Sequence, residues 1–234
     1  MPGDTMMKNQ ADSLGQLALA LPDKPPRYEA GGFVRSDAND AAWRVAQRWA
    51  VSDDPALIIC GPPKSGKTHL AHVIADGREC RFVDPLGLGR ALAEAPLVVV
   101  DGLPAHDSHG FLAALESDAA SMARVILTGA GHPSDWSMGL KDLRTRLEAM
   151  PRAVMNEPDE TLIRAIIAKG FRDRQVTVSR AVIDFAAPRL PRTFAAADGF
   201  VALADRAALA QKRKITVALV QKFIDELSGN QFKA

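Results

Sequence analysis

Cysteine is scarce in this chain, with two residues among 234. Cys60 lies inside an apolar run and Cys80 precedes another, and neither has the spacing of a zinc site or of a disulfide framework. We therefore interpret both as reduced, structural thiols, and we do not expect a disulfide to stabilise the fold.

An excess of charge and a long apolar run are also missing. The chain has 29 basic and 28 acidic residues, a formal net charge of +1, which argues against a strongly basic surface for nucleic acid. No apolar run approaches the roughly 18 residues of a membrane span, and the N-terminal residues do not have the layout of a signal peptide. We therefore expect a cytoplasmic protein that does not enter a membrane and does not read DNA sequence directly.

What the chain does contain is an ordinary globular composition, 47% hydrophobic and 24% charged. Its length corresponds to about one and a half domains of about 150 residues each. Short apolar runs alternate with helical patterns, which indicates a parallel sheet with helices on both faces. These runs lie at 56–60, 81–84, 97–101 and 124–128, and a last strand candidate lies at 153–155.

The pattern changes after the last strand candidate, because only helical periodicity follows. The later helices are expected at 161–171, 179–187, 192–212 and 216–227, and the earlier ones include 111–118. We therefore expect three regions: a tail with one apolar segment at 1–27, an α/β domain at 28–156, and a helical domain at 157–234.

The strongest motif follows the first of these strands and precedes a helix. It satisfies G-x-x-x-x-G-K-[ST], in which backbone N–H groups and the helix N-terminus converge on nucleotide phosphates. We expect Lys67 to reach the β- and γ-phosphates and the Thr68 hydroxyl to ligate Mg²⁺. The motif consists of Gly61, Pro62, Pro63, Lys64, Ser65, Gly66, Lys67 and Thr68.

A later strand ends in a carboxylate, Asp101, the pattern of a Walker B strand whose aspartate holds the magnesium water shell. Many ring-forming ATPases place an acidic residue next to polarise the attacking water, whereas Gly102 follows here. Without a general base, the rate of ATP hydrolysis is lower by about 10²–10⁴-fold. We expect weak or absent ATP hydrolysis by the chain itself, unless Asp107 in the following loop supplies the base.

Three segments resemble the bacterial replication initiator DnaA and its relatives in the AAA+ class. Residues 66–72, Gly-Lys-Thr-His-Leu-Ala-His, are similar to the family's G-K-T-H-L-x-H run. Residues 33–39 resemble its F-V-x-x-x-x-N segment, and residues 124–129 its sensor 1 strand. The resemblance implies an AAA+ P-loop NTPase fold with a C-terminal helical lid, and ADP or ATP with Mg²⁺ as cofactor. It also implies nucleotide contacts by Phe33, Val34 and Thr128.

Within that family, the chain resembles the Hda-type regulators, shortened homologues of the initiator that lack its helix-turn-helix DNA-binding domain. Their clamp-binding hexapeptide is similar to Gln16-Leu17-Ala18-Leu19-Ala20-Leu21. In extended form, Leu17, Leu19 and Leu21 share one face, as in a peptide laid in an apolar groove, while Gln16 suits a polar subpocket. The alternative is a segment that packs on its own domain.

Two arginines extend this resemblance. Residues 142–147 resemble the segment that carries an arginine finger, so Arg146, with Arg144 as the alternative, is implied to act in trans on a neighbour's nucleotide. Arg192 stands where the family has its sensor 2 arginine, which contacts the phosphates. The structural alternative for each is an arginine that is solvated or paired on the surface.

The resemblance implies a regulator, expected to be ADP-loaded, that binds the DNA sliding clamp and stimulates ATP hydrolysis by the initiator, which prevents re-initiation. It leaves self-association open. Two alternatives stay open beside it. One is an autonomous AAA+ ATPase of the helicase-loader type, and the other is a small P-loop kinase that uses Asp84 to orient an acceptor.

Overall fold

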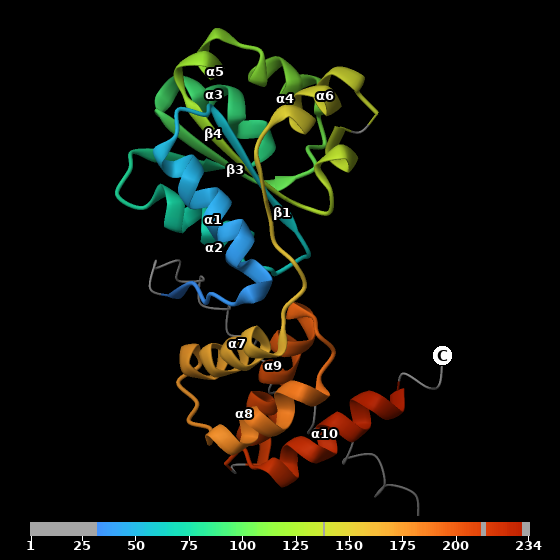
Figure 1. The fold of residues 1–234 in the computed structure, drawn as a ribbon. Coiled ribbons are helices and arrows are strands. Elements are labelled where there is room, and N and C mark those ends of the chain that lie inside the picture. The colour runs from blue at the N-terminus through green and yellow to red at the C-terminus, as the bar shows by residue number, and fades with distance from the viewer. Residues whose placement is uncertain (1–31, 138, 212–213, 231–234) are drawn as a thin grey trace, which may run out of the picture.

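The computed structural model describes residues 32–137, 139–211 and 214–230. An α/β part, residues 32–155, and a helical part, residues 160–230, are joined by a short extended connection (Figure 1). The expected clamp-binding segment at 16–21 lies outside the described residues. Within them, no helix combines the length and the apolar character that a membrane span needs.

The α/β part is built on one five-stranded sheet. The strands are β1 (Ala56–Gly61), β2 (Cys80–Val83), β3 (Leu97–Leu103), β4 (Arg124–Ala130) and β5 (Arg152–Val154). Every pair is parallel, and the spatial order is β2-β3-β4-β1-β5. Strands buried on both faces are expected to be continuously apolar, as β1 is over all six residues. The predicted parallel sheet is confirmed.

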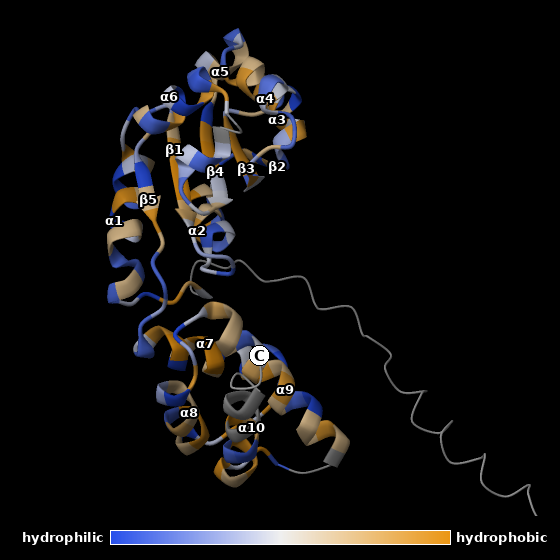
Figure 2. Ribbon diagram, turned by 90° about the vertical axis from the view of Figure 1, so that its right-hand side faces the viewer, coloured by the Kyte–Doolittle hydropathy of each residue, from blue (hydrophilic) through white to orange (hydrophobic). Residues whose placement is uncertain are grey.

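Helices cover both faces of this sheet (Figure 2), and successive side chains of a β-strand point to opposite faces. On one face, α1 (Asp37–Val51) and α2 (Lys67–Ala75) pack Trp49 and Leu70 against Leu57 and Ile59. On the other face, Ile58 packs under the remaining helices; Figure 2 shows the apolar strands enclosed between the two layers. These helices are α3 (Leu88–Glu94), α4 (Ser108–Leu115), α5 (Asp118–Met122) and α6 (Lys141–Ala149).

The helix expected at 111–118 corresponds to α4, which ends at Leu115, and a separate short helix, α5, begins at Asp118; Ser117 lies between them. Its hydroxyl donates to the backbone oxygen of Ala114 at 2.7 Å and accepts from the backbone N–H of Ala120 at 3.4 Å. Ser117 thereby ends one helix and caps the next, a role that serine fills readily. The described residues also include short 3₁₀ turns at η2 (Pro85–Gly87), η3 (Pro133–Ser137) and η4 (Ala187–Arg189).

The helical part has its own core. It consists of α7 (Glu160–Asp173), α8 (Arg180–Ala186), α9 (Phe194–Gln211) and α10 (Val217–Asn230). Phe171 and Phe200 meet edge to face in this core, with ring centroids 6.2 Å apart. The helix expected to begin at 192 begins at Phe194, because the Thr193 hydroxyl accepts a hydrogen bond from the backbone of Ala196.

Candidate nucleotide site

The phosphate loop, residues 61–68, leaves the end of β1 and enters α2, as the motif predicts. A Cβ at Gly61 would overlap the backbone oxygen of Met155, and Gly66 has φ of 90°, so both positions suit glycine. Lys64 adopts a left-handed backbone, with φ of 62°, although it is not glycine. Pro62 and Pro63 have no N–H, so the loop's backbone donors begin at Lys64.

Lys67 folds over the inside of this loop. Its ammonium donates to the backbone oxygens of Pro62, at 2.6 Å, and Gly61, at 3.2 Å, and lies 3.4 Å from the Ser65 hydroxyl. Burial lowers the pKa of Lys67, while the negative charge of Asp101 acts in the opposite direction. A cation is therefore held where the motif places nucleotide phosphates.

Asp101, near the end of β3, lies beside the start of α2. It accepts hydrogen bonds from the Thr68 hydroxyl, at 2.9 and 3.1 Å, and from the buried Thr128 hydroxyl on β4. The strand register pairs Asp101 with Thr128, which explains their contact. The structure thus brings together three residues that the sequence assigned to the nucleotide and its metal. Carboxylate and hydroxyl oxygens are the donors that Mg²⁺ prefers, so the set fits this ion.

The position after Asp101 has an unusual backbone. Gly102 has φ of 102°, and the pairing of β3 with β4 shifts between Asp101 and Leu103. An acidic residue here would have to adopt a conformation that L residues rarely take. Asp107, the proposed substitute base, is used otherwise: its carboxylate accepts from the backbone N–H of Gly110 at 2.9 Å and caps α4.

A cavity of about 250 Å³ opens beside the phosphate loop. Phe33 and Val34 line it, as expected, together with His69 from α2. Phe33 stacks on Trp43 and meets His69 edge to face. Asn39 also lines the cavity and donates to the backbone oxygen of Val34 at 2.8 Å. The asparagine of the 33–39 segment thus fixes the strip of backbone that borders the cavity.

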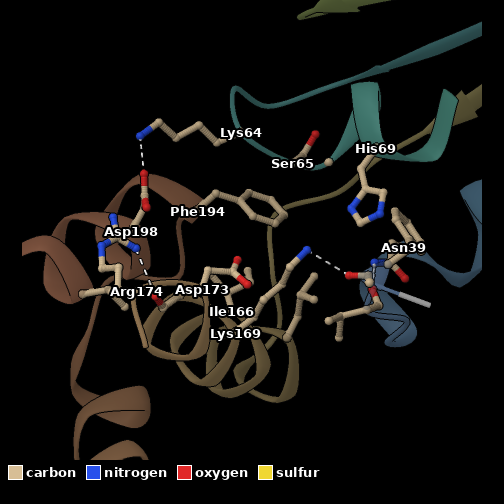
Figure 3. Close-up of a pocket in the computed structure, with 17 residues that line it drawn as sticks. Asn39, Lys64, Ser65, His69, Ile166, Lys169, Asp173, Arg174, Phe194 and Asp198 are labelled. Atoms are coloured by element: carbon tan, nitrogen blue, oxygen red, sulfur yellow. Dashed lines mark hydrogen bonds and ion pairs between the residues drawn. The ribbon is translucent and has the colours of Figure 1, made fainter. Parts of the chain in front are cut away.

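The opposite wall of the cavity comes from the helical part, which sequence reasoning did not assign (Figure 3). The α7 residues recur at helical spacing on its inner face, and that periodicity is the pattern that could have revealed them. Lys169 ties this wall to the start of the α/β part, because its ammonium donates to the backbone oxygen of Gly32 at 3.0 Å. The wall includes Leu162, Ile166, Lys169, Gly170, Asp173, Arg174, Phe194, Asp198 and Val201.

Lys67, Thr68, Asp101 and Thr128 are not among the residues that line this cavity, although they lie in or beside the phosphate loop. Four other residues expected to act lie elsewhere. Arg192 is exposed before α9 and is not among the residues that line the cavity. On α6, Arg146 pairs with Glu116 at 3.2 Å and Arg144 lies 3.8 Å from Glu148. Asp84, proposed for the kinase alternative, accepts from the backbone N–H of Gly87 and caps a 3₁₀ turn.

Solved structures provide the comparisons. Domain III of the replication initiation protein DnaA from Thermotoga maritima matches with a TM-score of 0.67 at 15% identity, over 86% of this chain and 97% of that one. AMPPCP-bound DnaA from Aquifex aeolicus matches with a TM-score of 0.60 at 18% identity, over 77% and 66%. A mutant form of Thermotoga maritima RuvB matches with a TM-score of 0.63 at 18% identity, over 87% and 74%.

No protein-family model matches the chain, and no curated protein sequence matches it. At these identities the solved structures establish the fold. The chain has the fold of an AAA+ P-loop NTPase, a five-stranded parallel sheet flanked by helices and followed by a helical part, and this prediction is confirmed.

Proposed function

We propose that this chain is a nucleotide-binding regulator of the Hda type. It binds ADP with Mg²⁺, attaches to the DNA sliding clamp through residues 16–21, and stimulates ATP hydrolysis by the replication initiator DnaA. One observation carries the proposal. An intact phosphate loop lies beside Asp101, while the next position has a backbone that suits glycine and supplies no base.

The residues of the α/β part divide the binding work. The phosphate loop supplies backbone donors and the Lys67 ammonium for the phosphates. The nucleobase lies beside Phe33 and Val34. Thr68 and Asp101 would hold Mg²⁺, which would neutralise phosphate charge. The likeness to AMPPCP-bound DnaA supports nucleotide as the ligand.

The geometry supports a regulator rather than an autonomous ATPase. General-base assistance contributes about 10²–10⁴-fold to such reactions. Gly102 has no side chain to provide it, and the Asp107 carboxylate is engaged as a helix cap. We therefore expect the bound nucleotide to be a stable structural ligand that turns over slowly.

The position of Arg146 supports action on another molecule's nucleotide. Arg146 lines a second cavity with Pro55 and Ala56, at the start of β1, whereas the phosphate loop follows the end of that strand. Six residues at about 3.3 Å each separate the two ends by about 20 Å. Arg146 is therefore remote from its own phosphate loop, and its side chain is 43% exposed to solvent.

The experiment measures ATP hydrolysis by the initiator on clamp-loaded DNA, with the full chain or its variants added. Arg146→Ala is expected to lose at least tenfold of the stimulation, since arginine fingers contribute about 10³–10⁵-fold in GTPases. Arg144→Ala is the matched control, on the same helix and 53% exposed. Equal stimulation by wild type and Arg146→Ala contradicts the finger, and loss with Arg144→Ala alone assigns it to Arg144.

Two further arms separate the remaining parts of the proposal. Gln16→Ala combined with Leu19→Ala and Leu21→Ala is expected to abolish clamp binding while nucleotide binding persists. Clamp affinity that survives the triple change removes the clamp from the proposal. Rapid ATP turnover by the isolated wild-type chain, lost in Lys67→Ala, supports the helicase-loader alternative instead.

A further inference from the structure

An ion pair crosses the cavity between the phosphate loop and the helical part. The Lys64 ammonium lies 2.5 Å from the Asp198 carboxylate of α9, and Figure 3 shows the two side chains meeting at the rim. Lys64 belongs to the phosphate loop itself and has a left-handed backbone. The pair therefore joins α9 directly to the segment that receives phosphates.

The other cations on the helical wall are engaged elsewhere. Lys169 donates to the backbone oxygen of Gly32, and the Arg174 guanidinium lies 4.0 Å from the Asp205 carboxylate. Arg192, expected to meet the phosphates, does not line the cavity. Asp198 thus contacts the phosphate loop through an ion pair, whereas the Arg174 guanidinium, which also lines the cavity, donates to the backbone oxygen of Gly170 and lies near Asp205.

A bound phosphate chain changes the surroundings of this pair. Phosphate oxygens on the loop attract the Lys64 ammonium and repel the Asp198 carboxylate, because like charges in one site disfavour each other. The repulsion grows with the charge of the phosphate chain, and a triphosphate carries one more negative charge than a diphosphate. Both side chains are about half exposed, so solvent screens the effect and keeps it small.

We infer that Asp198 is a specificity-determining residue of the nucleotide site. It pairs with Lys64, and its negative charge beside the phosphate loop favours a nucleoside diphosphate over a triphosphate. The inference rests on the nucleotide-binding part of the proposed function and assigns to α9 a role in the choice of nucleotide. The formal charges of Asp173 and Asp198 are balanced on this wall by those of Lys169 and Arg174, so the discrimination depends on the position of Asp198 beside Lys64.

The experiment measures the affinities of the full chain for fluorescent ADP and ATP analogues in the presence of Mg²⁺. Asp198→Asn is expected to raise ATP affinity by about two- to fivefold and ADP affinity less, so the ratio moves toward ATP. Added salt is expected to shrink this shift. Asp184→Asn is the matched control, because Asp184 also forms ion pairs within the helical part but does not line the cavity.

A double-variant comparison tests whether Asp198 acts through Lys64. Lys64→Gln is expected to weaken binding of both nucleotides and to reduce the Asp198→Asn shift. An unchanged ATP-to-ADP affinity ratio in Asp198→Asn overturns the inference, as does a ratio that moves equally in Asp184→Asn. If wild type binds neither nucleotide, or Lys67→Ala binds both as tightly as wild type, the proposed function fails instead.

Discussion

The α/β part and the helical part share one cavity but hold their side chains by different means. In the α/β part, the phosphate loop and the end of β3 use backbone conformations that favour glycine, at Gly66 and Gly102. In the helical part, Lys169 and Asp198 face the cavity because they lie on the inner sides of regular helices. The phosphate loop and the end of β3 therefore tolerate few substitutions, whereas residues of the helical wall can be substituted without a change of backbone conformation.

The largest expected effect tests whether the two parts unfold separately. Phe200 is 1% exposed in the core of the helical part, and Phe200→Ala is expected to remove about 3–5 kcal/mol from its stability. The chain's three tryptophans, Trp43, Trp49 and Trp136, all lie in the α/β part, so their fluorescence reports that part alone. Hydrogen exchange of α9 peptides reports the other.

We expect Phe200→Ala to shift the denaturant midpoint of α9 far more than that of the tryptophan signal. Phe111→Ala is the matched variant, because Phe111 is 3% exposed in the α/β core, and it should give the reverse pattern. Equal shifts in both probes for both variants would show one cooperative unit and remove the distinction between the parts.

An effect of intermediate size is expected when the same substitution, glycine to alanine, is made in each of the two parts and the stabilities are compared. Gly102→Ala forces an L residue into φ of 102° and is expected to destabilise the chain by about 1–2 kcal/mol. Gly199→Ala, within α9 and with nothing near the added Cβ, is expected to stabilise it by about 0.5–1 kcal/mol. Denaturant unfolding of both variants provides the check, and the same sign for both contradicts this account.

The smallest expected effect concerns pH, since all five histidines of the chain lie in the α/β part. Burial lowers the pKa of His72, whose ring stacks on Phe82 with centroids 3.8 Å apart. As pH falls below about 6.5, the unfolded chain binds this proton before the folded chain does, so the unfolding free energy decreases. Above that pH the contribution disappears.

His72→Gln is expected to flatten the fall in stability between about pH 7.5 and about pH 5.5, measured by tryptophan fluorescence in denaturant. The pH dependence of the helical part's stability, measured by hydrogen exchange at α9, should be the same in the variant and in the wild type. A variant that keeps the wild-type pH dependence of the α/β part would show that His72 does not contribute to it.

Much of the fold could be predicted from local sequence. The central strands β1, β3 and β4 are mostly short apolar runs, and the parallel sheet follows from runs that alternate with helical patterns. Thr68 and Asp101 were predicted from motif patterns and Thr128 from a resemblance, and the structure brings the three side chains into contact. The break between α4 and α5 was missed, because it depends on one serine that bonds in both directions.

The helical wall of the cavity could not be predicted in the same way. Lys64 and Asp198 are 134 positions apart, and their meeting depends on how the helical part docks on the α/β part. A P-loop motif identifies a phosphate site but contains no information on which distant helix faces it. Arg192 was expected at the phosphates from a resemblance; it is not among the residues that line the cavity, whereas Asp198 is.

Arg146 and the phosphate loop lie at opposite ends of β1, so the molecule has two different surfaces at these ends. A contact that brings one end to the other end of a neighbour joins unlike surfaces, so it is heterologous. Such contacts do not close into a two-fold dimer; they build a ring, or an open row whose two ends differ. Under the proposed function, this polarity would place the chain at one end of a row of initiators, with Arg146 toward the nucleotide that is exposed there.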